Sequence, residues 1–403
     1  MTPIVVIVGT LDTKGQEIEF LRDELSRHKC KVIVIDVGTL HPPACLADIH
    51  RDEVASAAGT NMDALRKQGD RRCAIETVIL GASTIVKGLH QDGRLSGILS
   101  VGGGTGTHIG MGVMRSLPLG VPKLMVSTVA SRDMSGLIGT KDITIMHSVV
   151  DILGLNPISR KILSNSAAAM AGMVFDSRTI HSEKPIVGLT SFGFITEGAM
   201  RVKNKLEQKG LEVAPFHANG TGGMAMEDLI EQGFINAVMD FALHEFADSL
   251  YGGYCGDIGP TRLETAGRMG LPQVVVPGGL DCIVMEFDSI ETMPVHLKGR
   301  PVFWYDFRSG VRTTKDDMIK MAQIISAKLN ASKGPTKLVI PVRGFSEADA
   351  ENEPLYDQDA DQLFVTEIKS RLDSKVDVIE VQAHINDEQF AETVVSILHS
   401  MLR

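Results

Sequence analysis

The run Pro3–Gly9, PIVVIVG, is the feature that most narrows the folds open to this chain. It is a continuous stretch of apolar, mostly β-branched residues, which is typical of a strand buried on both faces of a parallel sheet. Residues 14–28 follow with Ile18, Leu21 and Leu25 on one helical stripe, and a second apolar run, KVIVIDVG, comes next. This order of strand, helix and strand predicts a parallel sheet with a right-handed crossover.

The same pattern starts again near residue 185, where PIVGLTSFG opens a second series of strands and helices. We therefore predict an α/β fold with two Rossmann-like parallel-sheet subdomains, residues 1–181 and 182–403, and an interdomain cleft. The two halves form a weak internal repeat. The sequence leaves open whether this reflects duplication or only two units that obey the same folding rules.

Composition excludes several classes of protein. The formal net charge is −10 and the basic residues are scattered, so we expect no nucleic-acid partner. No apolar run reaches the length that spans a membrane, and the N-terminus has no basic leader, so we expect no membrane association. The five cysteines are widely spaced without a C-x-x-C pair, which argues against disulfides and zinc knuckles and predicts a reduced, cytoplasmic protein.

The glycine-rich stretch VGGGTGTHIGMGVM follows the apolar run SGILS at a predicted strand-to-helix turn. Gly102, Gly103 and Gly104 would permit positive φ and let a ligand approach the backbone. Thr105 and Thr107, on either side of Gly106, would cap the helix or hydrogen-bond phosphate oxygens. A turn alone needs fewer glycines, so the stretch favours a ligand-binding loop.

The first predicted strand ends in GTLDTKGQE, which starts a helix. Backbone N–H groups there form an anion site, to which Lys14 would add a charge and Thr13 a hydroxyl. Asp12 would cap the helix or hold Mg²⁺ through water. The alternative is a capped helix with a solvated lysine. Asp36 ends the second strand, either as a cap or where an acid meets a ribose hydroxyl.

A third polar loop, VSTVASRD, follows the strand PKLMV. Ser127, Thr128 and Ser131 supply hydroxyls and Arg132 supplies a cation. Because open α/β sheets bind ligands at the carboxyl ends of their strands, we expect the three loops to form one pocket.

The second half carries a looser set of candidates. Asp240, His244 and Asp248 would share one face if their segment is helical, as a metal or acid–base site or as a solvated polar face. Asp281 follows a buried strand and a Gly-Gly turn. Three arginines would pair with a carboxylate or phosphate: Arg308, Arg312 and Arg343. No nucleophile motif is present.

Several long stretches together resemble the tomato-mosaic-virus-resistance-protein-like ATP-binding domain family, which consists of uncharacterised microbial proteins and the amino-terminal inhibitory region of a plant resistance protein. They include GTLDTKGQE, SVGGGTGT, PKLMVSTVASRD, IGTKDITIMHSVVDILGLNPISRKILSNSAAAMAGMV, ADSLYGG, GPTRLETAGRMGLPQVVVPGGLD and PVRGFS. The resemblance covers nearly the whole chain. It implies two α/β subdomains, ATP and Mg²⁺ binding, and a homodimer. The plant relative's binding of a viral replication protein is not carried over to this chain.

The resemblance implies that ATP contacts residues of the three loops: Gly9, Thr10, Asp12, Thr13, Lys14, Gly102 to Thr107, and Ser127 to Arg132. In the second half the chain departs from the family pattern. The family's usual Gly-Ala-Leu-Asp-Met-Val-Asn-Phe-Gly is replaced by residues 278–287, so its asparagine is absent. Glu245, Asp248 and Asp281 are retained.

Three functions follow as hypotheses. The first is an ATP-dependent enzyme in which a small organic acid lies in the interdomain cleft, held by Arg308, Arg312 or Arg343, while Glu245 or Asp281 handles protons. The second is a non-catalytic ATP-regulated binding or interaction protein. A third is an ATP-independent hydrolase or metal enzyme that uses Asp240, His244 and Asp248.

Overall fold

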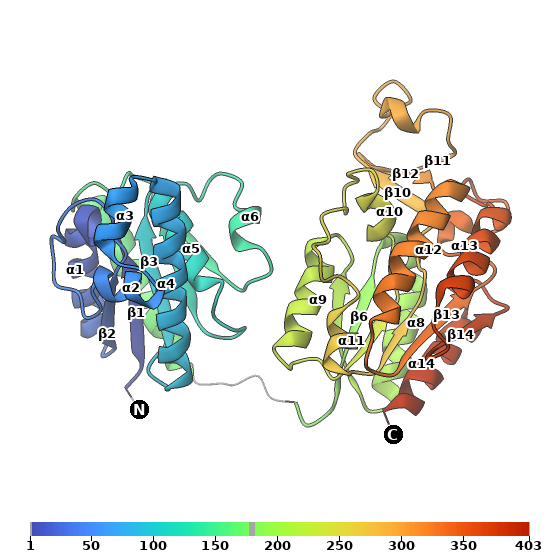
Figure 1. Cartoon of the computed structure of the whole chain (residues 1–403), viewed down its shortest axis with the longest axis horizontal. Coiled ribbons are helices and arrows are strands. Elements are labelled where there is room, and N and C mark those ends of the chain that lie inside the picture. Colours follow the sequence, from blue (N-terminus) through green and yellow to red (C-terminus); the bar gives the residue numbers. More distant parts are fainter. Residues whose placement is uncertain (1, 177–181, 403) are drawn as a thin grey trace. The chain divides into compact units, whose positions relative to one another are not determined.

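A computed structural model describes residues 2–176 and 182–402 of the chain. They fall into two compact units, Met1–Ile180 and His181–Arg403. The expected boundary between positions 181 and 182 adjoins residues 177–181, which lie outside the described residues. Each unit is an α/β domain built on an all-parallel sheet, and this confirms the predicted fold class (Figure 1).

The first domain alternates strands and helices around a five-stranded sheet of order β2-β1-β3-β4-β5. The chain first places β2 on one side of β1 and then adds β3, β4 and β5 on the other side. Strand order therefore reverses between β1 and β3. The elements are β1 (Ile4–Gly9), α1 (Leu11–Arg27), β2 (Lys31–Asp36), α2 (Arg51–Ala57), α3 (Met62–Gln68), α4 (Arg71–Gln91), β3 (Gly97–Gly102), α5 (Gly104–Met114), β4 (Lys123–Ser127), α6 (Ser135–Ile138), β5 (Thr144–His147) and α7 (Pro157–Phe175).

Strand β1 shows why a continuous apolar run is needed at the centre of this sheet. Val5 and Ile7 pack in one hydrophobic cluster with α1 and α7, whereas Val6 and Val8 pack in another with α4 and α5. All four side chains are fully buried. Each contributes about 1.5–3 kcal/mol of transfer free energy, so both helical layers are held to the same strand.

Residues 62–91 form two helices, α3 and α4, instead of one continuous helix. Gly69 ends α3 with a φ of 69°, in the left-handed region that favours glycine. The carboxylate of Asp70 then accepts hydrogen bonds from the backbone N–H groups of Arg72 and Cys73, and caps α4. This break fixes the start of α4 at Arg71.

In the described part of the chain, α4 is the one helix that is long and apolar enough to cross a membrane. The sequence analysis expects no such span. Val78, Ala82 and Val86 of this helix are fully buried in the first domain's core, whereas Leu80 is exposed. A core helix of a soluble domain can be equally long and apolar, so this is weak evidence for membrane insertion.

The second domain contains a six-stranded parallel sheet of order β14-β13-β9-β8-β6-β7. Its strand order reverses between β6 and β8. The elements are β6 (Ile186–Ser191), η1 (Gly193–Ile195), α8 (Thr196–Gln208), β7 (Glu212–His217), α9 (Thr221–Glu231), β8 (Ala237–Asp240), α10 (Glu245–Ser249), α11 (Thr265–Met269), β9 (Gln273–Val275), β10 (Cys282–Met285), η2 (Val295–Leu297), β11 (Val302–Trp304), β12 (Ser309–Arg312), α12 (Lys315–Asn330), β13 (Thr336–Pro341), η3 (Glu347–Asp349), α13 (Gln358–Arg371), β14 (Val376–Val381) and α14 (Glu388–Met401).

Successive residues of β13 again face opposite layers. Leu338 and Ile340 pack with α12 and α13, whereas Val339 packs in the cluster that includes α8 and α14. A small antiparallel sheet of order β10-β12-β11 is an addition that the sequence pattern did not predict. In Figure 1 its labels lie at one end of the second domain, beside α10, with which β10 is in contact.

Candidate functional site

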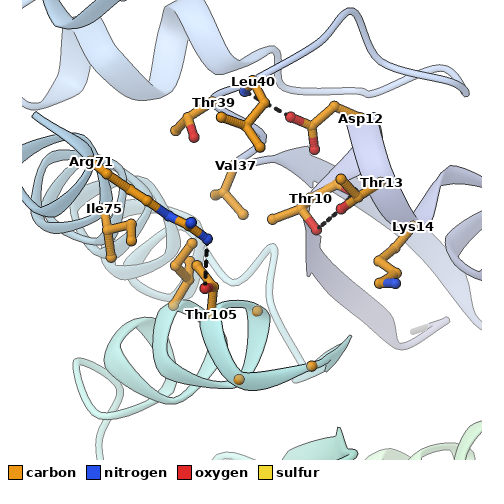
Figure 2. Close-up of a pocket in the computed structure, with 14 residues that line it drawn as sticks. Thr10, Asp12, Thr13, Lys14, Val37, Thr39, Leu40, Arg71, Ile75 and Thr105 are labelled. Atoms are coloured by element: carbon orange, nitrogen blue, oxygen red, sulfur yellow. Dashed lines mark hydrogen bonds between the residues drawn. The ribbon is translucent and has the colours of Figure 1, made fainter. Parts of the chain in front are cut away.

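A pocket lies at the carboxyl edge of the first domain's sheet, where strand order reverses between β1 and β3 (Figure 2). Open α/β sheets bind ligands at such switch points, because the loops diverge there and leave a crevice. Its cavity volume is about 280 Å³. The lining residues are Thr10, Asp12, Thr13, Lys14, Val37, Thr39, Leu40, Arg71, Ile75, Gly103, Gly104, Thr105, Gly106 and Ile109.

The glycine-rich loop forms one wall of this pocket through the first turn of α5. Gly103 is the N-cap residue, and no side chain caps this helix. The N–H groups of the first turn are therefore available to an anion, and the helix dipole favours negative charge at this end. The guanidinium of Arg71 donates to the hydroxyl of Thr105 at 3.2 Å and adds a cation beside the turn.

The glycines of this loop serve different purposes. The expectation of positive φ is wrong, because none of Gly102, Gly103, Gly104 and Gly106 adopts it. A Cβ at Gly102 would lie 2.7 Å from the Cα of Gly106, so packing requires glycine there. A Cβ at Gly103 would meet only a hydroxyl at 3.7 Å, and one at Gly104 would have no atom within 4 Å. At these two positions neither packing nor conformation requires glycine.

The opposite wall comes from the loop between β1 and α1. The Asp12 carboxylate accepts hydrogen bonds from the backbone N–H groups of Leu40 at 2.9 Å and His41 at 3.2 Å. It thereby holds the segment after β2 against the pocket. The Lys14 ammonium donates to the backbone carbonyl of Ile152. The hydroxyls of Thr10 and Thr13 lie 2.8 Å apart (Figure 2).

Three predicted site residues have structural partners and do not line the pocket. The buried Asp36 carboxylate accepts from the N–H groups of Leu11 and Gly38, and pairs with Arg51 at 3.2 Å. Burial raises the pKa of Asp36 in spite of these partners. The hydroxyls of Thr107 and Ser127 lie 2.7 Å apart and join the buried side of α5 to β4.

The remaining predicted contacts also lie outside the lining. Gly9 is packed, since a Cβ there would lie 1.9 Å from the Cδ1 of Ile18. Thr128 is half-buried and its N–H donates to the carbonyl of Gly102. Ser131 and Arg132 are exposed beyond the end of β4. The third loop therefore supports the glycine-rich loop instead of lining the cavity.

Several residues that line the pocket were not predicted from the sequence, and Arg71 is the charged one among them. A second cavity of about 290 Å³ shares Thr39, Leu40 and Arg71 with the first. Its other lining residues are more apolar and come largely from α3 and the start of α4: Met62, Leu65, Arg66, Gly69, Asp70 and Ala74. The signal in the sequence was the Gly69–Asp70 break, which places Arg71 at a helix start.

In the second domain, the predicted acid Glu245 is part of a buried ion-pair network. The fully buried Arg262 donates to Glu245 at 2.7 Å and to both carboxylate oxygens of Asp240 at 2.5 and 2.7 Å. Glu245 also accepts from the N–H of Gly220. Burial raises the pKa of Glu245, which Arg262 partly offsets. The network joins the ends of β8 and α10 to the loop before α11.

Asp281 belongs to a separate buried cluster and accepts from the Ser346 hydroxyl at 2.6 Å. Burial raises its pKa, and nearby Arg312 opposes this. Arg312 itself pairs with Asp361 at 2.6 Å, which offsets its charge, and lies 3.4 Å from Asp349. Two other arginines were predicted to hold an organic acid. Arg308 pairs with Asp306, and Arg343 is exposed.

The expectation that Asp240, His244 and Asp248 share a helical face is wrong. Asp240 ends β8, and α10 begins only at Glu245. The apolar run before Asp240 belongs to a central strand, and this overrides the helical spacing. Asp248 lies instead near Cys255, and the ligand atoms of His244, Asp248 and Cys255 all lie within 4.8 Å of one another.

Comparisons with known proteins agree with this two-domain organisation. Residues 3–179 match the N-terminal domain and residues 184–402 the C-terminal domain of the Uncharacterised protein family (UPF0261). A UPF0261 protein of Clostridium tetani is 42% identical over 100% of both chains. The ToMV resistance protein Tm-1(GCR237) of Solanum lycopersicum is 32% identical over 98% of this chain and 55% of the tomato protein.

Among solved structures, MurG of Acinetobacter baumannii aligns over 99% of both chains with 12% identity and a TM-score of 0.23, a likeness too weak to support any argument. The family matches, by contrast, account for both domains from end to end. The chain therefore belongs to the uncharacterised protein family UPF0261.

Proposed function

We propose that the first domain binds ATP at the β1/β3 switch point. The observation that carries the proposal is the pair Gly103 and Gly104, which line the cavity although neither packing nor conformation requires glycine there. Absent side chains at an uncapped helix start let phosphate oxygens reach backbone N–H groups. Arg71 and Lys14 supply positive charge on two sides of the same cavity.

The division into two adjoining cavities supports an extended ligand. The polar cavity fits a phosphate chain, and the apolar cavity beyond Thr39 and Leu40 fits the adenine base. Asp12 is the carboxylate in the polar cavity, and it would hold Mg²⁺ through water. The ATP-binding domain implied by the family resemblance agrees with this assignment.

The binding form of this function has more support than the enzymatic form. Glu245 and Asp281 are both buried in hydrogen-bonded clusters, and Arg312 is paired with Asp361. These partners occupy the groups that an ATP-dependent reaction on an organic acid would use. We therefore favour an ATP-regulated binding protein over an enzyme. Prolonged incubation with ATP and a panel of small carboxylic acids, followed by assay of ADP and AMP, separates the two forms.

The binding experiment is calorimetry on the full chain with ATP, AMP and adenosine, with and without Mg²⁺. Affinity should rise with the number of phosphates, because the helix start and the cations contact that part of the ligand. Mg²⁺ should strengthen ATP binding in the native chain and much less in Asp12→Asn. Absence of heat with ATP and Mg²⁺ would refute the proposal.

We further propose a cytoplasmic homodimer. All five cysteines are free, as expected of a protein from a reducing compartment. On α7, Asn165, Ala168, Ala169 and Gly172 are exposed, and such small residues let a second copy approach closely. Sedimentation velocity of the native chain should give a dimer, and Ala169→Glu should give a monomer.

A further inference from the structure

A buried histidine without a hydrogen-bond partner lies at the carboxyl edge of the second domain's sheet. His244 follows β8 and is fully buried, and neither ring nitrogen has a partner among the described residues. Its ring stacks on Phe192, which follows β6, with 3.8 Å between centroids. Burying a polar group without a partner costs roughly 1–3 kcal/mol in proteins, so this position calls for a ligand.

Two more donor atoms face this histidine. The Asp248 carboxylate and the Cys255 thiol have ligand atoms within 4.8 Å of each other and of a ring nitrogen of His244. Backbone N–H groups of Val284 and Cys255 donate to Asp248 at 2.6 and 2.8 Å and fix the carboxylate. A carboxylate has about four lone-pair sites, so two hydrogen bonds leave capacity for a cation.

Two glycines allow the chain to pack closely around these three groups. A Cβ at Gly253 would lie 2.8 Å from the carboxylate carbon of Asp248, so the loop that leads to Cys255 wraps closely around this side chain. Gly279 has a φ of 75°, and a Cβ there would lie 2.5 Å from the ring of Phe192 and 2.7 Å from the Cβ of His244. Larger residues at either position would displace a donor side chain or its support.

Among the described residues, no lysine or arginine forms an ion pair with Asp248, whose partners are backbone N–H groups. Arg262, the nearby buried cation, is engaged by Asp240 and Glu245. Arg308, which lies near Cys255, pairs with Asp306 at 2.8 Å. A divalent cation would supply positive charge to the buried Asp248 carboxylate.

We propose that His244, Asp248 and Cys255 bind a zinc ion. Imidazole, carboxylate and thiolate are the ligands that Zn²⁺ takes in proteins, and the thiolate disfavours Mg²⁺ and Ca²⁺. Three protein ligands leave the fourth position of a tetrahedron for a water molecule. The inference is independent of ATP binding in the first domain.

The test uses the full chain, freed of metal by a chelator, and titrated with Co²⁺ as a spectroscopic substitute for Zn²⁺. We expect one Co²⁺ per chain with a thiolate-to-metal charge-transfer absorption, which Zn²⁺ then displaces. Cys255→Ser should remove this absorption and weaken metal binding at least tenfold. His244→Asn should weaken binding to a similar degree. The control Cys73→Ser removes a thiol of the first domain and should leave both readouts unchanged.

Circular dichroism checks that each variant is folded. Because Asp248 also accepts two backbone hydrogen bonds, Asp248→Asn is the variant most exposed to a folding defect, and Cys255→Ser and His244→Asn decide the question without it. Failure of the native chain to bind Co²⁺, or an absorption that survives Cys255→Ser, would overturn the assignment.

Discussion

The two domains place opposite kinds of structure at the same edge of a parallel sheet. In the first domain this edge is open: a helix start without a side-chain cap, two glycines that packing does not require, and a cavity of about 280 Å³. In the second domain the corresponding edge is filled by Arg262, its carboxylate partners and the buried His244. A shared fold therefore fixes where a site can form, while the loop side chains decide what it can bind.

Arg262→Ala gives the largest expected effect and tests the filled edge. It would leave the carboxylates of Asp240 and Glu245 buried without their cation, which costs about 3–5 kcal/mol in the free energy of unfolding. Arg268→Ala, which removes a half-exposed arginine 3.3 Å from Glu231, should cost less than about 1 kcal/mol. Urea denaturation measures both. Equal losses would mean that the buried network stabilises no more than a surface pair.

Gly102→Ala and Gly104→Ala separate packing from openness within one loop. A methyl group at position 102 collides with the backbone of Gly106, so we expect a loss of about 1–3 kcal/mol in stability. At position 104 the methyl group meets nothing within 4 Å, and stability should change by less than about 0.5 kcal/mol. Thermal denaturation of the two variants gives the contrast, and similar losses would contradict it.

Arg71→Ala tests the open edge by removing a cation that the cavity presents to its ligand. Because charge-assisted hydrogen bonds to phosphate contribute about 1.5 kcal/mol or more, ATP affinity should fall about tenfold while stability stays unchanged. Arg72→Ala removes the next residue, whose exposed guanidinium pairs with Glu76. ATP affinity should be unchanged in that control. An equal effect of the two substitutions in calorimetry would argue against the pocket.

Asp349→Asn gives a smaller effect, visible only against pH. Burial and the neighbouring carboxylates of Asp361 and Asp281 raise the pKa of Asp349 above its unfolded value of about 4. The folded chain then keeps a proton that the unfolded chain releases, so stability falls as pH rises above about 4. The variant should flatten this fall, by up to about 1.4 kcal/mol per pH unit. If the stability of Asp349→Asn and that of the native chain changed with pH in parallel, the raised pKa of Asp349 would be refuted. Asp359→Asn, which removes an exposed carboxylate, is the control.

Sequence patterns predicted the fold because they report local chemistry. Apolar β-branched runs predicted the central strands, and the start of α4 is visible in Gly69 and Asp70. The loop after β1 and the glycine-rich loop were also found, since both directly follow strands of the switch point.

The pairing of charges was not predictable, because it depends on contacts between distant segments. Asp36 meets Arg51, and Arg312 meets Asp361, only after the domains fold. The same applies to Cys255, which reaches His244 and Asp248 through a glycine-rich loop with no known metal-binding spacing. Such residues carry no periodicity that marks them in advance.

ATP binding by the Gly104→Val variant is the most direct test of the difference between the open edge of the first domain and the filled edge of the second. Its side chain would extend from a position that contacts no other residue into the pocket, so the fold should persist while phosphate access is lost. Gly88→Val, at a helical glycine that also has open space around it, is the matched control. We predict, by isothermal titration calorimetry with ATP and Mg²⁺, at least 100-fold weaker binding to Gly104→Val and native affinity for Gly88→Val. Native affinity in folded Gly104→Val would contradict the account.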